Sequence, residues 1–214
     1  MACSKKIIIA LALVVGLAGC AREEGSVKDL PLKRDVPAEL LVENPPEFSI
    51  LLSDRDKLAL ARRILDLGPG VDPEEAARAA DIAYDYTAEL REEYQITDPP
   101  LIHNFKVNRG IKPRGLCWHW AEDMERRLKR ENFQTLSLHR AIANHDNVRI
   151  DHSTAIVSAA GSTMFDGIVL DPWRKGGVLS WMPVAEDRRY DWRPRAEVLQ
   201  FYRNREAGTI RSQN

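Results

Sequence analysis

Three residues of different chemical type, Cys117, His152 and Asp171, follow one another in an order that could support nucleophilic catalysis. A cysteine attacks a carbonyl carbon only as its thiolate, and an unperturbed thiol, with a pKa of about 8.5, is mostly protonated at neutral pH. An imidazole can accept the thiol proton, and a carboxylate can then orient the imidazole and stabilise its positive charge. We therefore predict a catalytic triad of Cys117, His152 and Asp171.

The thiol is expected at the start of a helix. An apolar stripe at three-to-four spacing predicts a helix from about Leu116 to Lys129, directly after Pro113-Arg114-Gly115. The unpaired N–H groups and the dipole at a helix N-terminus stabilise a negative charge there. Gly115 would let the backbone approach a substrate closely, and we predict substrate contacts from Gly115 and Trp118.

The imidazole and the carboxylate are expected on neighbouring strands. Apolar residues alternate with polar or small ones from Leu136 to Ile142, which is typical of a half-buried strand. A second strand is predicted over 148–158, which contains His152, and a third over 165–170, which ends at Asp171. Adjacent antiparallel strands lie about 4.8 Å apart, so this histidine and this aspartate can touch if the register agrees.

Two further helices are predicted upstream, where they would act as a scaffold. Ser53 is expected to cap the first, over 54–67, and Asp72 to cap the second, which opens with Pro73. The first helix is expected to bury a stripe that consists of Leu58, Ala61 and Leu65.

The remaining segments complete an α+β prediction. The chain between Pro100 and Gly115 has no regular period and is expected to be irregular, and a helix is predicted from Pro194 to about Arg205. Helices are thus followed by an antiparallel sheet, which is an α+β layout. Whether the last helix covers a groove or packs beneath it stays open.

The residues around the thiol resemble a known family. Gly115-Leu116-Cys117-Trp118 is similar to the glycine, variable residue, cysteine, tryptophan motif of the transglutaminase-like superfamily, a relative of papain. His152 at an apolar strand and Asp171-Pro172 at the end of the next resemble that family's other two motifs, over residues 111–173. The resemblance implies a papain-like core and attack on amide bonds through an acyl-enzyme, which water or an amine would release. Ser153 and Thr154 depart from the small and aromatic residues common after the family's histidine.

The N-terminus has the pattern of an export signal. Lys5 and Lys6 precede an apolar run over 7–18, which is shorter than the roughly 20 residues that cross a bilayer. The run ends in Leu17-Ala18-Gly19-Cys20, which resembles the lipobox of bacterial lipoproteins. This resemblance implies that residues 1–19 are a signal peptide and that Cys20 carries lipid.

The lipoprotein resemblance also sets the expected domain order and location. Residues 20–50 are charged or rich in proline, with few apolar positions, and are expected to form a flexible tether to a hydrolase domain over 51–214. Ala21, rather than aspartate, follows the lipidated cysteine, which by resemblance favours the outer membrane, facing the periplasm. Peptides, proteins or peptidoglycan stems are then the expected substrates.

Composition narrows the choice of function. The net charge is −1, which offers no basic excess for nucleic acid. Of the three cysteines, Cys3 would leave with the signal and Cys20 would be acylated. Cys117 would then be an unpaired thiol in a compartment where cysteines usually pair, which indicates a reactive residue.

The other histidines are less suited to a role as the catalytic base or as metal ligands. His119 lies two positions after Cys117, about 200° around the helix, and is expected to pack or to lie on the surface rather than act as the base. His139 and His145 lack the spacing of zinc ligands, so no metal and no cofactor are predicted. A second donor to an oxyanion, beside the Cys117 N–H, could come from Asn104 or His103. The alternative function is a catalytically inactive, lipid-tethered binding module that uses the same groove.

Overall fold

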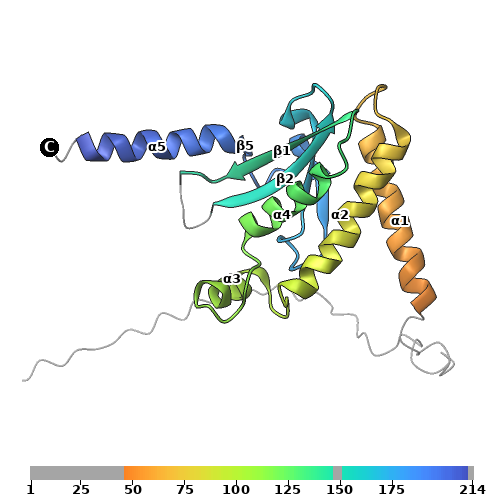
Figure 1. Ribbon diagram of the computed structural model, residues 1–214, viewed down its shortest axis with the longest axis horizontal. Helices are drawn as coiled ribbons and strands as arrows, with labels where there is room; N and C mark the ends of the chain where they lie inside the picture. Colours follow the sequence, from red (N-terminus) through yellow and green to blue (C-terminus); the bar gives the residue numbers. More distant parts are fainter. Residues whose placement is uncertain (1–45, 147–150, 212–214) are drawn as a thin grey trace, which may run out of the picture. The chain divides into compact units, whose positions relative to one another are not determined.

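Helices precede an antiparallel sheet in this protein, which confirms the predicted α+β class (Figure 1). The computed structural model describes residues 46–146 and 151–211, and side chains over 54–146 and 151–207. The α-helices are α1 (Pro46–Leu65), α2 (Pro73–Glu93), α3 (Pro100–Asn108), α4 (Cys117–Lys129) and α5 (Arg195–Arg211). The strands are β1 (Leu136–Ala143), β2 (His152–Ala159), β3 (Ile168–Asp171), β4 (Ser180–Pro183) and β5 (Arg193–Pro194), with short 3-10 helices η3 (Met164–Asp166) and η4 (Val184–Glu186).

The sheet has the strand order β4-β3-β2-β1-β5, and every neighbouring pair is antiparallel. Strand β2 is central, and all its residues except the last are buried. On its two sides, Ala155 pairs with Arg140 of β1 and with Leu170 of β3. The predicted meander of three strands is therefore confirmed, and β4 and β5 extend it at the two edges.

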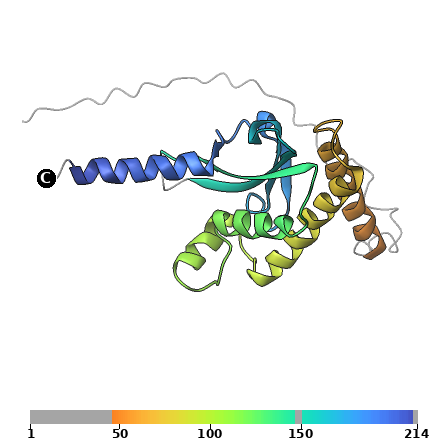
Figure 2. The same cartoon turned by 45° about the horizontal axis from the view of Figure 1, so that its top comes forward.

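The two faces of the sheet have different partners. On one face Ala155 and Val157 pack against α1, α2 and α4, where Met124 and Leu128 of α4 are fully buried. On the other face Ile156 packs against buried Trp192 and Met164. Figure 2 shows α4 lying along β1 and β2. The first residue of α4, Cys117, lies near the start of β2.

Helix α2 begins as predicted. Oδ1 of Asp72 accepts hydrogen bonds from the backbone N–H groups of Glu74 and Glu75, both at 2.9 Å, and Pro73 occupies the first helical position. The buried Glu75 carboxylate then accepts the backbone N–H groups of Gln134 and Thr135, each at 2.8 Å. These bonds connect the first turn of α2 to the two residues that precede β1.

Helix α1 differs from its prediction in both its start and its buried face. It begins at Pro46, so Ser53 lies inside the helix rather than at its cap, and the helix includes residues predicted to belong to the tether. The buried residues are Leu60 and Ile64, whereas Leu58 is 51% exposed. Both stripes have helical spacing, and contact with α2 and the sheet selects between them.

The segment predicted to be irregular before Gly115 contains α3. Pro99 and Pro100 stand at the N-cap and first helical positions, and the helix runs for nine residues. Only His103 is buried in it. With so little buried surface, no periodic stripe reveals the helix, and the proline at its first position is the local signal that could have found it.

The C-terminal half follows its prediction with shifted boundaries. Residues 148–150 of the predicted second strand lie outside the described residues, and Phe165 belongs to η3 rather than to β3. The predicted C-terminal helix is present as α5, which contacts β1 and β5 through its first turns and extends away from the sheet in Figures 1 and 2. Over 46–146 and 151–211, none of the helices has the length and apolar character needed to cross a membrane.

Candidate active site

Cys117 is the first residue of α4 and is half-buried, and its thiol is free. Its sulfur contacts the backbone carbonyl of Asp151 at 4.0 Å, which places it at the start of β2. Gly115, two residues earlier, has a φ of 120°, and a Cβ there would lie 2.4 Å from Nε2 of His103. Only glycine fits this turn, and the turn sets the direction in which α4 presents its first residue.

His119 stabilises the same turn. Its Nδ1 accepts the backbone N–H groups of Gly115 at 3.1 Å and Leu116 at 3.2 Å. Burial, reinforced by the charge of Arg114, lowers the pKa of His119 to about 4, so the ring is neutral and can accept these bonds at neutral pH. His119 is thus buried and caps the turn, which agrees with the expected packing role, whereas the capping bonds were not predicted.

His152 and Asp171 are in direct contact. The His152 ring donates from Nε2 to Oδ2 of Asp171 at 2.7 Å, and both side chains are almost fully buried. The register explains the contact, because Ala155 pairs with Leu170 and the next residues, Thr154 and Asp171, therefore lie opposite each other. His152 is two residues beyond Thr154 on the same face, within diagonal reach of the carboxylate.

The second ring nitrogen of His152 is left for the thiol. Nδ1 is buried and makes no hydrogen bond of regular geometry in the described part of the chain. Burial alone would lower the pKa of His152, but the interactions with Asp171 and Cys117 outweigh it and raise the pKa to about 9. The influence of Cys117 on this pKa indicates that the thiol lies close to the imidazole. The structure thus brings the three predicted triad residues together.

The carboxylate of Asp171 is itself held by Arg174. Asp171 Oδ2 accepts a hydrogen bond from Arg174 Nε at 2.9 Å, and Oδ1 accepts the Arg174 backbone N–H at 3.1 Å. The same guanidinium bonds both oxygens of Asp187, at 3.2 and 2.6 Å. Burial would raise the pKa of Asp171, but His152 and Arg174 together hold that pKa below its ordinary value, so the carboxylate stays ionised.

Aromatic rings surround the imidazole. The His152 ring centroid lies 4.7 Å from those of Trp173 and Tyr190 and 5.5 Å from that of Trp192. These rings restrict both water and ring rotation around His152. Tyr190, Trp192 and Asp187 were not singled out from the sequence. These three residues lie in a charged loop without a regular period. The closely spaced aromatic residues of this loop were the one sequence signal that could have indicated them.

The structure shows the contacts of the two residues considered as a second oxyanion donor. Nε2 of His103 donates to the backbone carbonyl of Arg114 at 2.8 Å, and the residue is 1% exposed, so His103 supports the turn before Cys117. Oδ1 of Asn104 accepts the indole N–H of Trp173 at 3.0 Å, beside the ring that faces His152. The Asn104 amide therefore lies next to the aromatic ring that contacts the His152 imidazole. Trp118, predicted to contact substrate, is 45% exposed at the start of α4.

No metal site is found among the described residues. In the described ranges no three histidine, cysteine or acidic side chains form a group that could hold a metal ion. The two histidines weighed earlier as ligands have other contacts, His139 Nε2 with Ser158 Oγ at 2.8 Å and the His145 ring with Phe201.

Comparisons with known proteins identified no similar protein. The chain matches no protein-family model, no curated protein and no solved structure.

Proposed function

We propose that this protein is a thiol hydrolase of amide bonds with a transglutaminase-like, papain-like core, in which Cys117, His152 and Asp171 are the catalytic residues. The observation that carries the proposal is the state of His152: a buried imidazole with one nitrogen bonded to Asp171, the other without a hydrogen-bond partner among the described residues, and Cys117 close enough to influence its pKa. A pKa raised to about 9 keeps this ring protonated at neutral pH. Asp171 balances the charge of this buried imidazolium, and the imidazolium in turn would stabilise a thiolate at Cys117.

The proposed reaction follows from these positions. The Cys117 thiolate attacks the amide carbonyl carbon, a C–S bond forms, and negative charge moves to the carbonyl oxygen. The backbone N–H of Cys117, at the head of α4 and without an intrahelical acceptor, would stabilise that oxyanion. His152 then gives its proton to the leaving amine as the C–N bond breaks. Water then gives a proton to the neutral His152 ring and attacks the thioester carbonyl carbon. The C–S bond breaks, the acid leaves, and the thiolate and the imidazolium are restored.

The residues around the triad would hold it in this geometry. Arg174 and Asp187 keep Asp171 ionised and oriented, and Asp171 fixes the ring of His152. The turn at Gly115, supported by His103 and His119, presents the thiol at the head of the helix. Release of the acyl group by an amine instead of water would give transamidation from the same intermediate.

The proposed setting is the bacterial cell envelope. Residues 1–45, which include the predicted signal peptide and Cys20, lie outside the described residues. The motif before Cys20 supports a lipid anchor, and an outer-membrane location facing the periplasm would bring peptides or peptidoglycan stems to the site. Labelling cells with radioactive palmitate tests the anchor: Cys20→Ala should abolish incorporation, whereas Cys3→Ala should leave it unchanged. Labelling that survives in Cys20→Ala would overturn this part of the proposal.

The catalytic part is tested by the reactivity of one thiol. We expect iodoacetamide to alkylate Cys117 at pH 7 at least tenfold faster in the wild-type protein than in His152→Ala, because the variant loses the imidazolium that stabilises the thiolate. His139→Ala is the matched control, since His139 is a partly buried histidine of the same sheet bonded to Ser158. Mass spectrometry of the alkylated peptide gives the rate.

Equal rates in the wild-type protein and His152→Ala would contradict an activated pair. The chain would then be better described as the alternative weighed from its sequence, a lipid-tethered binding module with an inactive groove. Cleavage itself is tested with Cys117→Ala, in which an acyl-enzyme cannot form and no hydrolysis of an envelope peptide should remain.

A further inference from the structure

A cavity of about 740 Å³ lies outside the proposed catalytic centre, since none of the three triad residues lines it. It is formed between α4, β1, η3 and the start of α5, and its volume falls in the range of small-molecule sites. Four cationic side chains line it, Lys129, Arg140, Arg195 and Arg203, against the two carboxylates of Glu125 and Glu197. The lining therefore carries an excess of positive charge.

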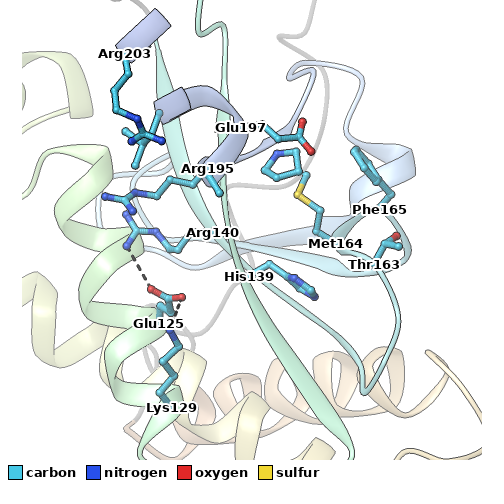
Figure 3. A pocket seen from close by; sticks show the side chains of 13 residues that line it. Glu125, Lys129, His139, Arg140, Thr163, Met164, Phe165, Arg195, Glu197 and Arg203 are labelled. Carbon is cyan, nitrogen blue, oxygen red and sulfur yellow. Dashed lines mark ion pairs between the residues drawn. The ribbon is translucent and has the colours of Figure 1, made fainter. Parts of the chain in front are cut away.

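Three of these cations gather at one place. Figure 3 shows the guanidinium groups of Arg140, Arg195 and Arg203 on the α4 side of the cavity, whereas Glu197 lies on the other side. We call these three residues the arginine cluster. Guanidinium groups repel one another, so their approach in a cavity with few carboxylates indicates a place for an anion.

The carboxylates nearby do not neutralise the cluster. Glu125 is shared, since it bonds Lys129 Nζ at 2.9 Å and lies 3.5 Å from Arg140 Nη1. Arg203 donates to the neutral amide of Gln200 at 2.6 Å. Among the described side chains, neither Arg195 nor Arg203 forms an ion pair with a carboxylate.

Arg140 is the most informative member of the cluster. Its side chain is 11% exposed, and its buried Nε has no hydrogen-bond partner among the described residues. Burial lowers its pKa, and the charge of Arg195 lowers it further against the opposing effect of Glu125. A buried cation in this state gains from an added anion, because buried charges are stable when paired and hydrogen-bonded.

The cluster is also connected to the head of α4. Nη2 of Arg140 donates to the backbone carbonyl of Trp118 at 3.4 Å, and Trp118 is the residue after Cys117. An anion bound by Arg140 would therefore lie near the first turn of α4, which begins with Cys117.

We propose that the arginine cluster binds a carboxylate of the substrate, so that the enzyme acts on acidic peptides with a glutamate- or aspartate-like group within a few residues of the attacked amide. This inference rests on the proposed hydrolase function for its choice of substrate class. Guanidinium forks bind carboxylates by paired hydrogen bonds, and the peptides of the proposed substrate class carry such groups.

The test measures binding and needs no turnover. The full chain with Cys117→Ala is titrated by calorimetry with two capped heptapeptides that differ only in three glutamates or three glutamines. We expect the glutamate peptide to bind at least tenfold more tightly, with a preference that weakens as salt increases. The double variant Arg195→Gln, Arg203→Gln should lose the preference. Arg62→Gln, an exposed arginine of α1, is the matched control and should retain it.

The outcomes separate this inference from the hydrolase proposal. Equal affinities for the two peptides, or a preference that survives in the double variant, would overturn the carboxylate site. Tight binding of inorganic phosphate that depends on the same arginines, without discrimination between the peptides, would overturn it too and assign the cluster to phosphate. A glutamate preference in a chain whose Cys117 proves unreactive would support the anion site and remove the hydrolase.

Discussion

Arg174 donates from Nε to Oδ2 of Asp171 across 2.9 Å, and this is the oxygen that also receives the N–H of His152. One carboxylate oxygen thus joins the imidazole to a guanidinium, and the guanidinium continues to buried Asp187. The orientation of His152 therefore depends on a network of charges, in which each buried anion has a cation beside it.

Arg174→Met should destabilise the fold by about 3–5 kcal/mol at pH 7, because it leaves two buried carboxylates without their shared cation. The lowered pKa of Asp171 means that the stabilisation from its ionised form is present above its ordinary pKa and is lost as the pH falls. The deficit of the variant should therefore persist from pH 7 down to about the ordinary pKa of 3.8 and shrink below it, as urea denaturation can measure. Arg188→Met, at an exposed arginine, should change stability by less than about 0.5 kcal/mol.

The protonation of His152 gives a second prediction. Nuclear magnetic resonance titration of its ring should give a pKa near 9, and Asp171→Asn should lower that value by more than one unit, because burial then dominates. The folded-state pKa is raised, so its stabilisation is complete below the ordinary value of about 6.5 and is lost as the pH rises through about 9. Hydrolysis should decline over the same range, since the proton for the leaving amine is lost. A titration near 6.5 in the wild-type protein would contradict this account.

Position 115, in the turn before the thiol, should not tolerate a side chain. Gly115→Ala should cost about 2–4 kcal/mol, because its φ of 120° disfavours alanine and the new Cβ would meet the His103 ring. Gly70→Ala is the matched control, since a Cβ there meets nothing within 4 Å. Denaturation of both variants gives the comparison. Adding His103→Ala to Gly115→Ala should recover only part of the loss, because the backbone strain remains.

Two leucines of α1 test which face of that helix is buried. Leu60→Ala should destabilise the protein by about 2–5 kcal/mol, because Leu60 is fully buried in the core. Leu58→Ala removes the same atoms from a residue that is 51% exposed and should cost less than about 0.5 kcal/mol. Similar losses in the two variants would show that the helix packs on a different face.

The elements that carry the triad could be predicted from the sequence because their signals are local. The apolar stripe of α4, the Asp72 cap of α2 and the alternation along β1 each depend on residues within one or two turns or on a period of two. The order of Cys117, His152 and Asp171, with a glycine before the thiol, then suggested which side chains would meet.

The surroundings of the triad were decided only by tertiary structure. Arg174 and Asp187 form a pair across a loop, and Tyr190 and Trp192 reach His152 from a segment without any period. The arginine cluster likewise unites β1 with α5. Local patterns show that a residue can be buried or capped, but not which distant charge or ring it will face. Those choices depend on strand register, on which helix face packs and on where a loop returns to the sheet, and these are set by contacts between segments far apart in the chain.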